Sequence, residues 1–186
     1  MASATPLQPT LWRTCRVVAS RTRLQFFGLL VQEPGQSVSW AATRLSQPLS
    51  VASESLRMLE ARGLLTVSRT GRRVTYQLAR STGDSSTGLT AALRFVFQRE
   101  SQPVEIVFKL ATAFTHPRRI EIFRVIQTKP QTLAQIHAAT GIPGRALQRH
   151  LSKLESRGFI VCRLGIYSVV KRTDAFGCEL ARLATG

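Results

Sequence analysis

The sequence is poor in acidic residues and has no long apolar run. Asp and Glu together number 10 among 186 residues. The longest nearly apolar run, residues 24–31, is far shorter than the roughly 20 residues that a membrane-spanning helix needs. The opening segment MASATPLQPT lacks the charged stretch and following apolar stretch of a secretory signal. We therefore expect a cytoplasmic protein with no membrane partner.

Cysteine and histidine are also scarce, and neither is spaced as a metal site. The chain has three of each: Cys15, Cys162, Cys178, His116, His137 and His150. No Cys-x-Cys, Cys-x-x-Cys or local histidine chelate is present, and an odd number of distant cysteines argues against a disulfide framework. We expect His116 to start a helix and His150 to pack in a partly buried position. Cys162 and Cys178 are expected to be buried, although they could still meet in space.

The motifs of common enzyme classes are missing. No paired carboxylates, glycine-rich phosphate loop or nucleophile motif occurs in a plausible setting. No aromatic stacking platform for RNA is visible, although RNA binding stays open. We predict that the chain is not an enzyme and that it uses no metal and no cofactor.

What the sequence does contain is positive charge. Lys and Arg number 26, which gives a net charge of +16. Residues 1–86 carry 11 basic and 4 acidic side chains, and residues 87–186 carry 15 and 6, so the charge is not confined to a tail. Most of the basic residues are arginine, which suits phosphate and guanine edges but can also reflect genome composition. The net charge itself predicts a polyanionic partner.

A repeat of about half the chain covers most of the sequence. The segment LEARGLLTV, residues 59–67, matches LESRGFIVC, residues 154–162, and TRLQFFGLL, residues 22–30, matches RRIEIFRVI, residues 118–126. Five positions between them also correspond at one offset: Val38, Ala41, Pro48, Ala52 and Leu56 against Leu133, Ile136, Pro143, Leu147 and Leu151. The serine- and glycine-rich residues 81–88 are typical of a linker. We predict two copies of one folding unit.

In the second copy the pattern predicts helix, helix, helix-turn-helix and hairpin. Apolar residues at helical spacing mark residues 104–114 and 120–126 as helices. The later boundaries have local signals: a Lys129-Pro130 stop, a Thr132–Gln135 capping box, a start at Pro143 and a left-handed cap at Gly158. FIVCR and IYSVV, on either side of Leu164-Gly165, predict two short strands, and residues 176–183 predict a last helix.

The first copy repeats this order. Residues 24–30 predict a helix, Ser37 opens a short second helix, and Pro48 lies near the start of a third. LLTVS and VTYQL flank the glycine turn RTGRR and predict a clearer hairpin than the second copy has. Residues 89–97 predict a further helix that completes the unit.

Both copies resemble a known family. The winged-helix domain of ArsR-type bacterial transcriptional regulators is similar to the first copy in TRLQFFGLL, the LSQP turn, LRMLEARGLL and SRTGRRVTYQL, and to the second in HPRRIEIFRVI and LQRHLSKLESRGFI. The resemblance covers about residues 20–79 and 115–170. It implies DNA binding, with the second helix of the helix-turn-helix in the major groove and the hairpin wing on the backbone or minor groove. Such regulators are usually homodimers of one domain, whereas these two copies could form an intramolecular pseudo-dimer.

We therefore predict a mainly α fold with small β-hairpins (α+β), built from two winged-helix domains in tandem. The first domain is expected over residues 1–80, a linker and connecting helix over residues 81–103, and the second domain over residues 104–186.

The predicted DNA contacts lie on the two recognition helices and the two wings. The face of the second helix opposite its leucine stripe carries Arg145, Arg149, Ser152 and Ser156, and Gln148 and Lys153 flank that face. The corresponding positions of the first copy are less basic: Ser50, Ser53, Glu54 and Arg57. The wing candidates are Arg69, Arg72, Arg73 and Arg163. Solvated surface is the alternative interpretation for all of these side chains, but the net charge and the helix-turn-helix context favour DNA.

These residues favour a DNA-binding transcriptional regulator whose partner is double-stranded DNA. Two alternatives stay open. One is a non-specific nucleoid-associated protein, and the other is a winged-helix scaffold for protein partners, because a fold does not fix a function. Glu54 and the short second wing favour the scaffold, whereas the net charge opposes it. Self-association is also left open.

Overall fold

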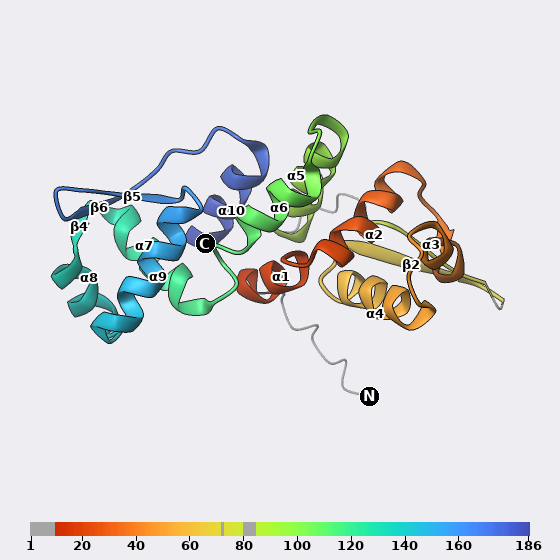
Figure 1. Cartoon of the computed structure of the whole chain (residues 1–186), viewed down its shortest axis with the longest axis horizontal. Helices are drawn as coiled ribbons and strands as arrows, with labels where there is room; N and C mark the ends of the chain where they lie inside the picture. The colour runs from red at the N-terminus through yellow and green to blue at the C-terminus, as the bar shows by residue number, and fades with distance from the viewer. Residues whose placement is uncertain (1–9, 72, 80–84) are drawn as a thin grey trace.

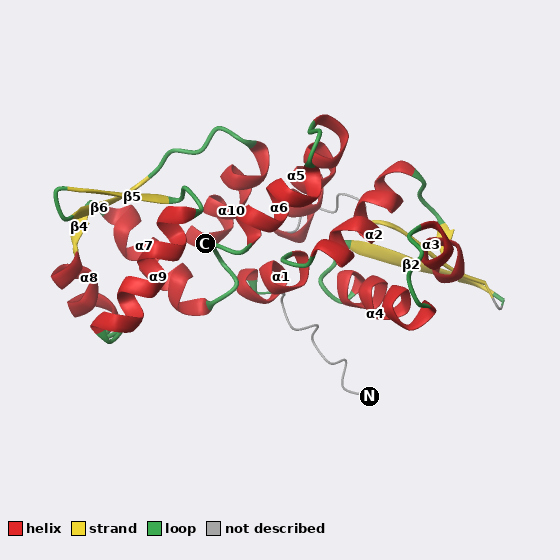
Figure 2. Cartoon of the chain, viewed as in Figure 1, coloured by secondary structure: helices red, strands yellow, loops and turns green. Residues whose placement is uncertain are grey.

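The computed structural model describes residues 10–71, 73–79 and 85–186, and the chain is mainly helical with two small antiparallel sheets (Figure 2). The predicted fold class, mainly α with small β-hairpins, is confirmed. The elements of the first half are α1 (Leu11–Val18), α2 (Arg21–Gln32), β1 (Gln36–Ser37), α3 (Val38–Arg44), α4 (Leu49–Glu60), β2 (Leu65–Thr70), β3 (Arg73–Leu78) and α5 (Ser85–Arg99). Those of the second half are α6 (Pro103–Ala111), α7 (Pro117–Thr128), β4 (Gln131–Thr132), α8 (Leu133–Thr140), α9 (Gly144–Ser156), β5 (Ile160–Arg163), β6 (Ile166–Val169) and α10 (Ala175–Thr185). Within the described ranges, every helix is too short or too polar to cross a bilayer.

Each half contains a three-stranded sheet of the same topology. The strand orders are β1-β3-β2 and β4-β6-β5, and a glutamine opposes a tyrosine in both, Gln36 with Tyr76 and Gln131 with Tyr167. The strands β2 and β3 have 6 residues each, whereas β5 and β6 have 4 each, so the first hairpin is the longer wing. The sequence did not predict β1 and β4, because two polar residues give no alternating pattern.

Local capping signals fix the helices of the second half. Gln135 N donates to Thr132 Oγ1 at 3.3 Å and Thr132 N donates to Gln135 Oε1 at 2.8 Å, so the predicted capping box is confirmed. Gly141 and Gly158 have φ angles of +63° and +72°, which are left-handed conformations that glycine adopts without strain. The predicted glycine stop after α9 is therefore confirmed as well.

The helix α1 was not predicted from the sequence. Its buried face consists of Thr14, Cys15, Val17 and Val18, which is too short a pattern to show a helical period. Arg23 Nε donates to Val17 O at 2.6 Å, and Arg119 Nε donates to Ala113 O at 2.5 Å in the second half. Arg23 of α2 and Arg119 of α7 occupy corresponding positions in the two halves, and each arginine holds the chain segment that precedes its own helix.

The predicted linker over residues 81–88 was partly wrong. The helix α5 begins at Ser85, so residues 85–88 are helical, and residues 81–84 lie outside the described ranges. Tertiary contacts override the local composition here, because Leu89 and Leu93 are buried in the core and α5 packs against α10, α2 and α6. Gly88 of α5 lies directly against the Glu179 carboxylate of α10, so the two helices approach closely here. The predicted helix through residues 89–97 is confirmed.

The two halves share an apolar interface. The helices α1 and α2 pack against α6, α5 packs against α10, and the buried apolar residues of both halves form one connected core (Figure 1). Arg21 and Glu105 form an exposed ion pair of 2.6 Å across this boundary. The β2–β3 and β5–β6 hairpins lie at opposite ends of the long axis (Figure 1).

Candidate nucleic-acid interface

The helix α9 has one buried apolar face and one exposed face that is basic and polar. Leu147, Leu151 and Leu154 are buried. The exposed side chains are those predicted from the sequence, Arg145, Gln148, Arg149 and Ser152, and Lys153 beside them is half-buried. No ion pair formed among the described residues involves Arg145 or Arg149. Both guanidinium groups are therefore available to an external acceptor.

The turn that precedes α9 is held by side-chain hydrogen bonds. Thr140 Oγ1 donates to Ile136 O at 2.8 Å, and His137 Nδ1 donates to Ile142 O at 2.7 Å. Ile142 is itself buried and anchors the turn in the core. These contacts set the angle between α8 and α9, and so fix the direction in which α9 presents its basic face.

The corresponding helix of the first half, α4, is less basic. Of its predicted contact residues, Ser50, Glu54 and Arg57 are exposed, and Ser53 is half-buried. Burial lowers the pKa of Arg23 beneath α4, and the neighbouring Glu54 carboxylate opposes that shift. Arg23 Nη1 also donates to Met58 Sδ at 3.6 Å. When the two copies are aligned, Arg149 of α9 corresponds to Glu54 of α4, and Lys153 corresponds to Met58. At these two positions α9 is therefore positively charged and α4 is not.

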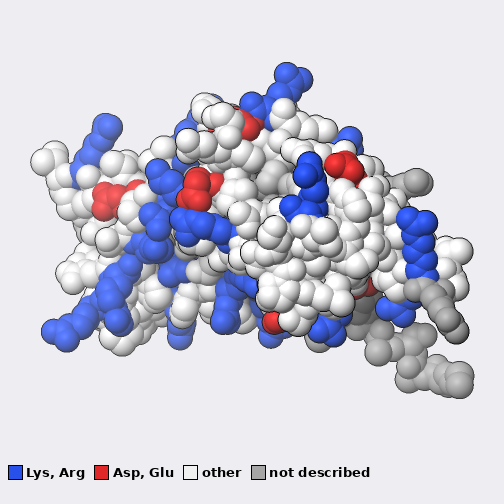
Figure 3. All heavy atoms as spheres, turned by 45° about the vertical axis from the view of Figure 1, so that its right-hand side comes forward, with Lys and Arg blue, Asp and Glu red and all other residues white. Residues whose placement is uncertain are grey.

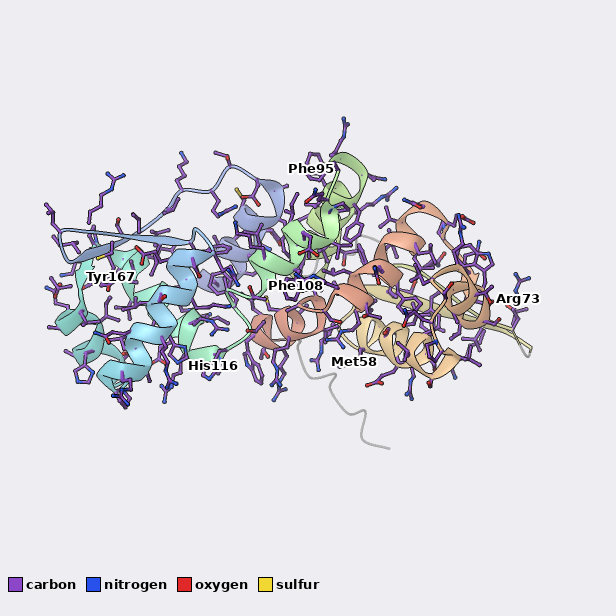
Figure 4. All side chains as sticks on the ribbon, in the orientation of Figure 1. Met58, Arg73, Phe95, Phe108, His116 and Tyr167 are labelled. Carbon is purple, nitrogen blue, oxygen red and sulfur yellow. The ribbon has the colours of Figure 1, made fainter. Side chains whose placement is uncertain are left out.

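The two wings differ in length and chemistry. Arg69 and Arg73 are exposed on the long first wing, where Arg73 lies near the tip, and Arg72 lies outside the described ranges (Figure 4). The short second wing has Arg163 exposed beside Leu164, which is fully exposed with a φ of +50°. The structure thus places the described wing arginines on the surface, and their contact with DNA stays a prediction.

Two stacked histidines lie where α7 meets α9. His116 caps α7, its Nδ1 accepting from Arg118 N at 3.2 Å, and its ring centroid lies 4.8 Å from that of His150. Their predicted positions, at a helix start and in a partly buried site, are confirmed. Burial lowers the pKa of both rings, and the cations Arg119 and Arg118 lower it further. Burial and neighbouring arginines also lower the pKa of Lys153.

The lowered pKa values of His116 and His150 predict that the folded protein loses stability in mild acid. Their pKa is lower in the folded protein than the value of about 6.5 expected when unfolded, so the unfolded chain binds protons more readily. The free energy of unfolding should therefore fall as the pH drops through about 6.5. Urea unfolding across this range measures it. The double variant His116→Asn, His150→Gln should show a weaker dependence, and an unchanged dependence would assign the effect to other groups.

The cysteines only partly match the prediction. All three are free thiols, and Cys162 is half-buried in β5. Cys178 is exposed on α10, so the prediction that it is buried was wrong. The reason is that α10 buries Phe176 and Leu180 against the core, which turns the position between them toward solvent. The described residues contain no group of three or more His, Cys, Asp or Glu side chains that could hold a metal ion.

Sequence reasoning missed the basic residues of α1. Arg13 and Arg16 are exposed there, three residues apart on one turn of the helix. Figure 3 shows that Lys and Arg side chains gather along the lower edge of the molecule, which α9, α1 and α4 form in Figure 1. The only sequence signal for α1 is the apolar pattern of residues 14–18. This pattern spans little more than one turn, which is too short to indicate a helix that carries these arginines.

The comparison with known proteins supports a helix-turn-helix domain in the second half. Residues 114–163 match a family of helix-turn-helix domains. No curated protein matches the chain. The match runs from the residues before α7 to the end of β5, and it includes α8, the buried turn and α9. The match and the geometry together support a helix-turn-helix domain over residues 114–163, a type of domain that typically binds DNA with its second helix.

Proposed function

We propose that this chain is a DNA-binding transcriptional regulator that reads duplex DNA with α9. The observation that carries this proposal is the exposed row Arg145, Gln148 and Arg149 on the second helix of the matched helix-turn-helix domain. Arginine binds both acceptors on the guanine edge and glutamine binds adenine, and the amino-terminal part of a recognition helix is the part that reaches the bases. The positive charge of both halves fits a phosphate-rich partner.

We further propose that the two halves are winged-helix domains in tandem, arranged as an intramolecular pseudo-dimer of the ArsR type. Three features support this proposal. The two sheets have the same strand order. Arg23 and Arg119 make equivalent backbone contacts. The helices α5 and α10, which follow the hairpins of the two halves, pack against each other. In this arrangement the first wing contacts the DNA backbone through Arg69, Arg72 and Arg73.

Selection of bound duplexes from a random DNA pool, followed by binding measurements at several salt concentrations, tests the proposal. We expect a recoverable motif. We also expect the logarithm of the binding constant to fall linearly with the logarithm of salt, with a slope of about −0.9 for each phosphate contact. Binding without a motif would instead support the nucleoid-associated alternative. An absence of binding at low salt would contradict DNA binding altogether.

One observation favours a protein partner for the first half. Leu49, at the start of α4, is 58% exposed, and Glu54 adds a negative charge to the same helix. The Glu54 carboxylate repels a phosphate backbone, whereas a protein partner can contact both side chains. In this second candidate function, α4 binds a protein while α9 and the wings stay on DNA. The change Leu49→Ser should then reduce capture of that partner and leave DNA affinity unchanged.

A further inference from the structure

The helix α1 presents two arginines on a rigid support. Arg13 and Arg16 are exposed, and their guanidinium carbons lie 5.1 and 5.9 Å from the ring centroid of Trp12. The opposite face of α1 is buried in the core, and Arg23 fixes its end by donating to the carbonyls of Val17 and Arg16. Within the described ranges neither Arg13 nor Arg16 forms an ion pair with a carboxylate.

These arginines belong to the first half, but α1 lies beside the start of α7 in the second half, where Leu11 and Trp12 line one pocket with Pro117 and Ile120. Arg16 is close enough to His116 to lower the pKa of that ring, and His116 stacks on His150 of α9. Around these rings are the further cations Arg118, Arg119 and Arg149, and Arg119 is in turn close to Lys153 and Arg157. The one ion pair that the described residues form with this group joins Arg118 to Glu121. The group is therefore strongly positive and mostly uncompensated.

Several of these cations already have structural partners. Arg119 holds the end of the segment before α7, and Arg157 Nε donates to Thr112 Oγ1 at 2.7 Å. Arg13 and Arg16 have no such contact with a described acceptor apart from the Trp12 ring, and Arg149 has none. Like charges that are held together on rigid helices repel each other, and a row of phosphates relieves that repulsion.

We propose that α1 forms part of the DNA interface, with Arg13 and Arg16 bound to backbone phosphates beside the major groove that α9 enters. This inference rests on the proposed function. The sugar-phosphate backbones flank the groove that a recognition helix enters, and most contacts of DNA-binding proteins are made with them. The stacked rings of His116 and His150 join the start of α7, beside which α1 lies, to the flank of α9. In this arrangement the first half contacts DNA through the arginines of α1, although its helix α4 carries the acidic Glu54.

The double variant Arg13→Gln, Arg16→Gln tests this inference against a charge-matched control. The control is Arg94→Gln, Arg99→Gln on α5, whose Phe95 lies at the upper edge, opposite His116 and Met58 at the lower edge (Figure 4). Both variants remove two exposed charges, so they lower the net charge equally. Circular dichroism and thermal melting establish that both proteins fold like the wild type. Binding to a selected duplex and to a random duplex is then measured from about 50 to 200 mM salt.

The α1 variant should weaken binding to both duplexes and make the salt slope shallower by about 1.8, because two phosphate contacts are lost. The affinity ratio of wild type to variant should accordingly shrink by roughly tenfold between 50 and 200 mM salt. The control should keep the wild-type slope. Phosphate ethylation interference should disappear at the phosphates that Arg13 and Arg16 contact and persist at those that α9 contacts.

Two outcomes would overturn the inference, and they are distinguishable. If the α1 variant keeps the wild-type slope while Arg145→Ala loses site affinity, α1 lies off the DNA and the proposed function stands. If the wild type itself shows no salt-dependent binding, the proposed function and this inference are both wrong.

Discussion

Replacing Arg149 or Arg145 with alanine should weaken binding to the preferred DNA site by about 1–3 kcal/mol, because a bidentate contact with a base edge contributes that much discrimination. Both side chains are exposed on α9, and neither has an ion pair with a described carboxylate, so their loss leaves no orphaned charge. The variant should also tolerate more bases at the position that the lost arginine reads. Titration of each variant against the selected duplex and against random duplex measures the effect.

The comparison of the two duplexes decides what these arginines do. A base-reading arginine loses more affinity on the selected duplex than on the random one, whereas a phosphate contact loses the same on both. The control Arg99→Ala removes one exposed charge from α5, outside the helix-turn-helix segment, and should change neither affinity strongly. Equal losses on both duplexes would show that α9 does not read bases, although DNA binding itself would stand.

Replacing Phe159 with alanine should lower the free energy of unfolding by about 3–5 kcal/mol, which is the cost of a cavity in place of a buried aromatic side chain. Phe159 is fully buried shortly after α9 ends at Ser156, and its ring centroid lies 4.7 Å from that of Phe114 and 6.2 Å from that of Phe123. The Arg172 guanidinium covers the ring at 5.2 Å. Urea unfolding followed by circular dichroism measures the loss.

Leu164→Ala is the matched control for this core prediction. Leu164 belongs to the hairpin that follows Phe159 but is fully exposed, so its truncation should change stability by less than about 0.5 kcal/mol. If Phe159→Ala cost no more than this control, the aromatic group of Phe114, Phe123 and Phe159 would not support α9 as the packing indicates.

Much of the fold could be predicted from the sequence because its signals are local. The capping box at Thr132, the glycine stop at Gly158 and the leucine stripe of α9 each depend on a few neighbouring residues. The features that the sequence did not predict depend instead on contacts between segments that are distant in sequence. Residues 85–88 have the composition of a linker but are helical, because α5 finds its partner in α10, which is distant in sequence. The strand β1 exists only because β3 pairs with it.

The candidate site divides in the same way. The exposed row on α9 follows from helical spacing alone, and the structure places it as expected. The proximity of Arg16 to His116 could not be predicted, because the residues lie in different halves of the chain and meet only through the packing of α1 beside α6. The same holds for Glu54 and Arg23, whose electrostatic contact needs α2 and α4 to be in place.

The contact of α5 with α10 joins two halves of a single chain, so its formation does not depend on the protein concentration. Two separate subunits with this interface would dissociate on dilution, whereas tethered halves face each other at a constant effective concentration. Because Glu54 and Arg149 occupy corresponding places, the two halves present different chemistry to the outside. The inverted repeat of a DNA site mirrors the two-fold symmetry of a dimer, so under the proposed function we expect the site of this chain to lack a palindrome.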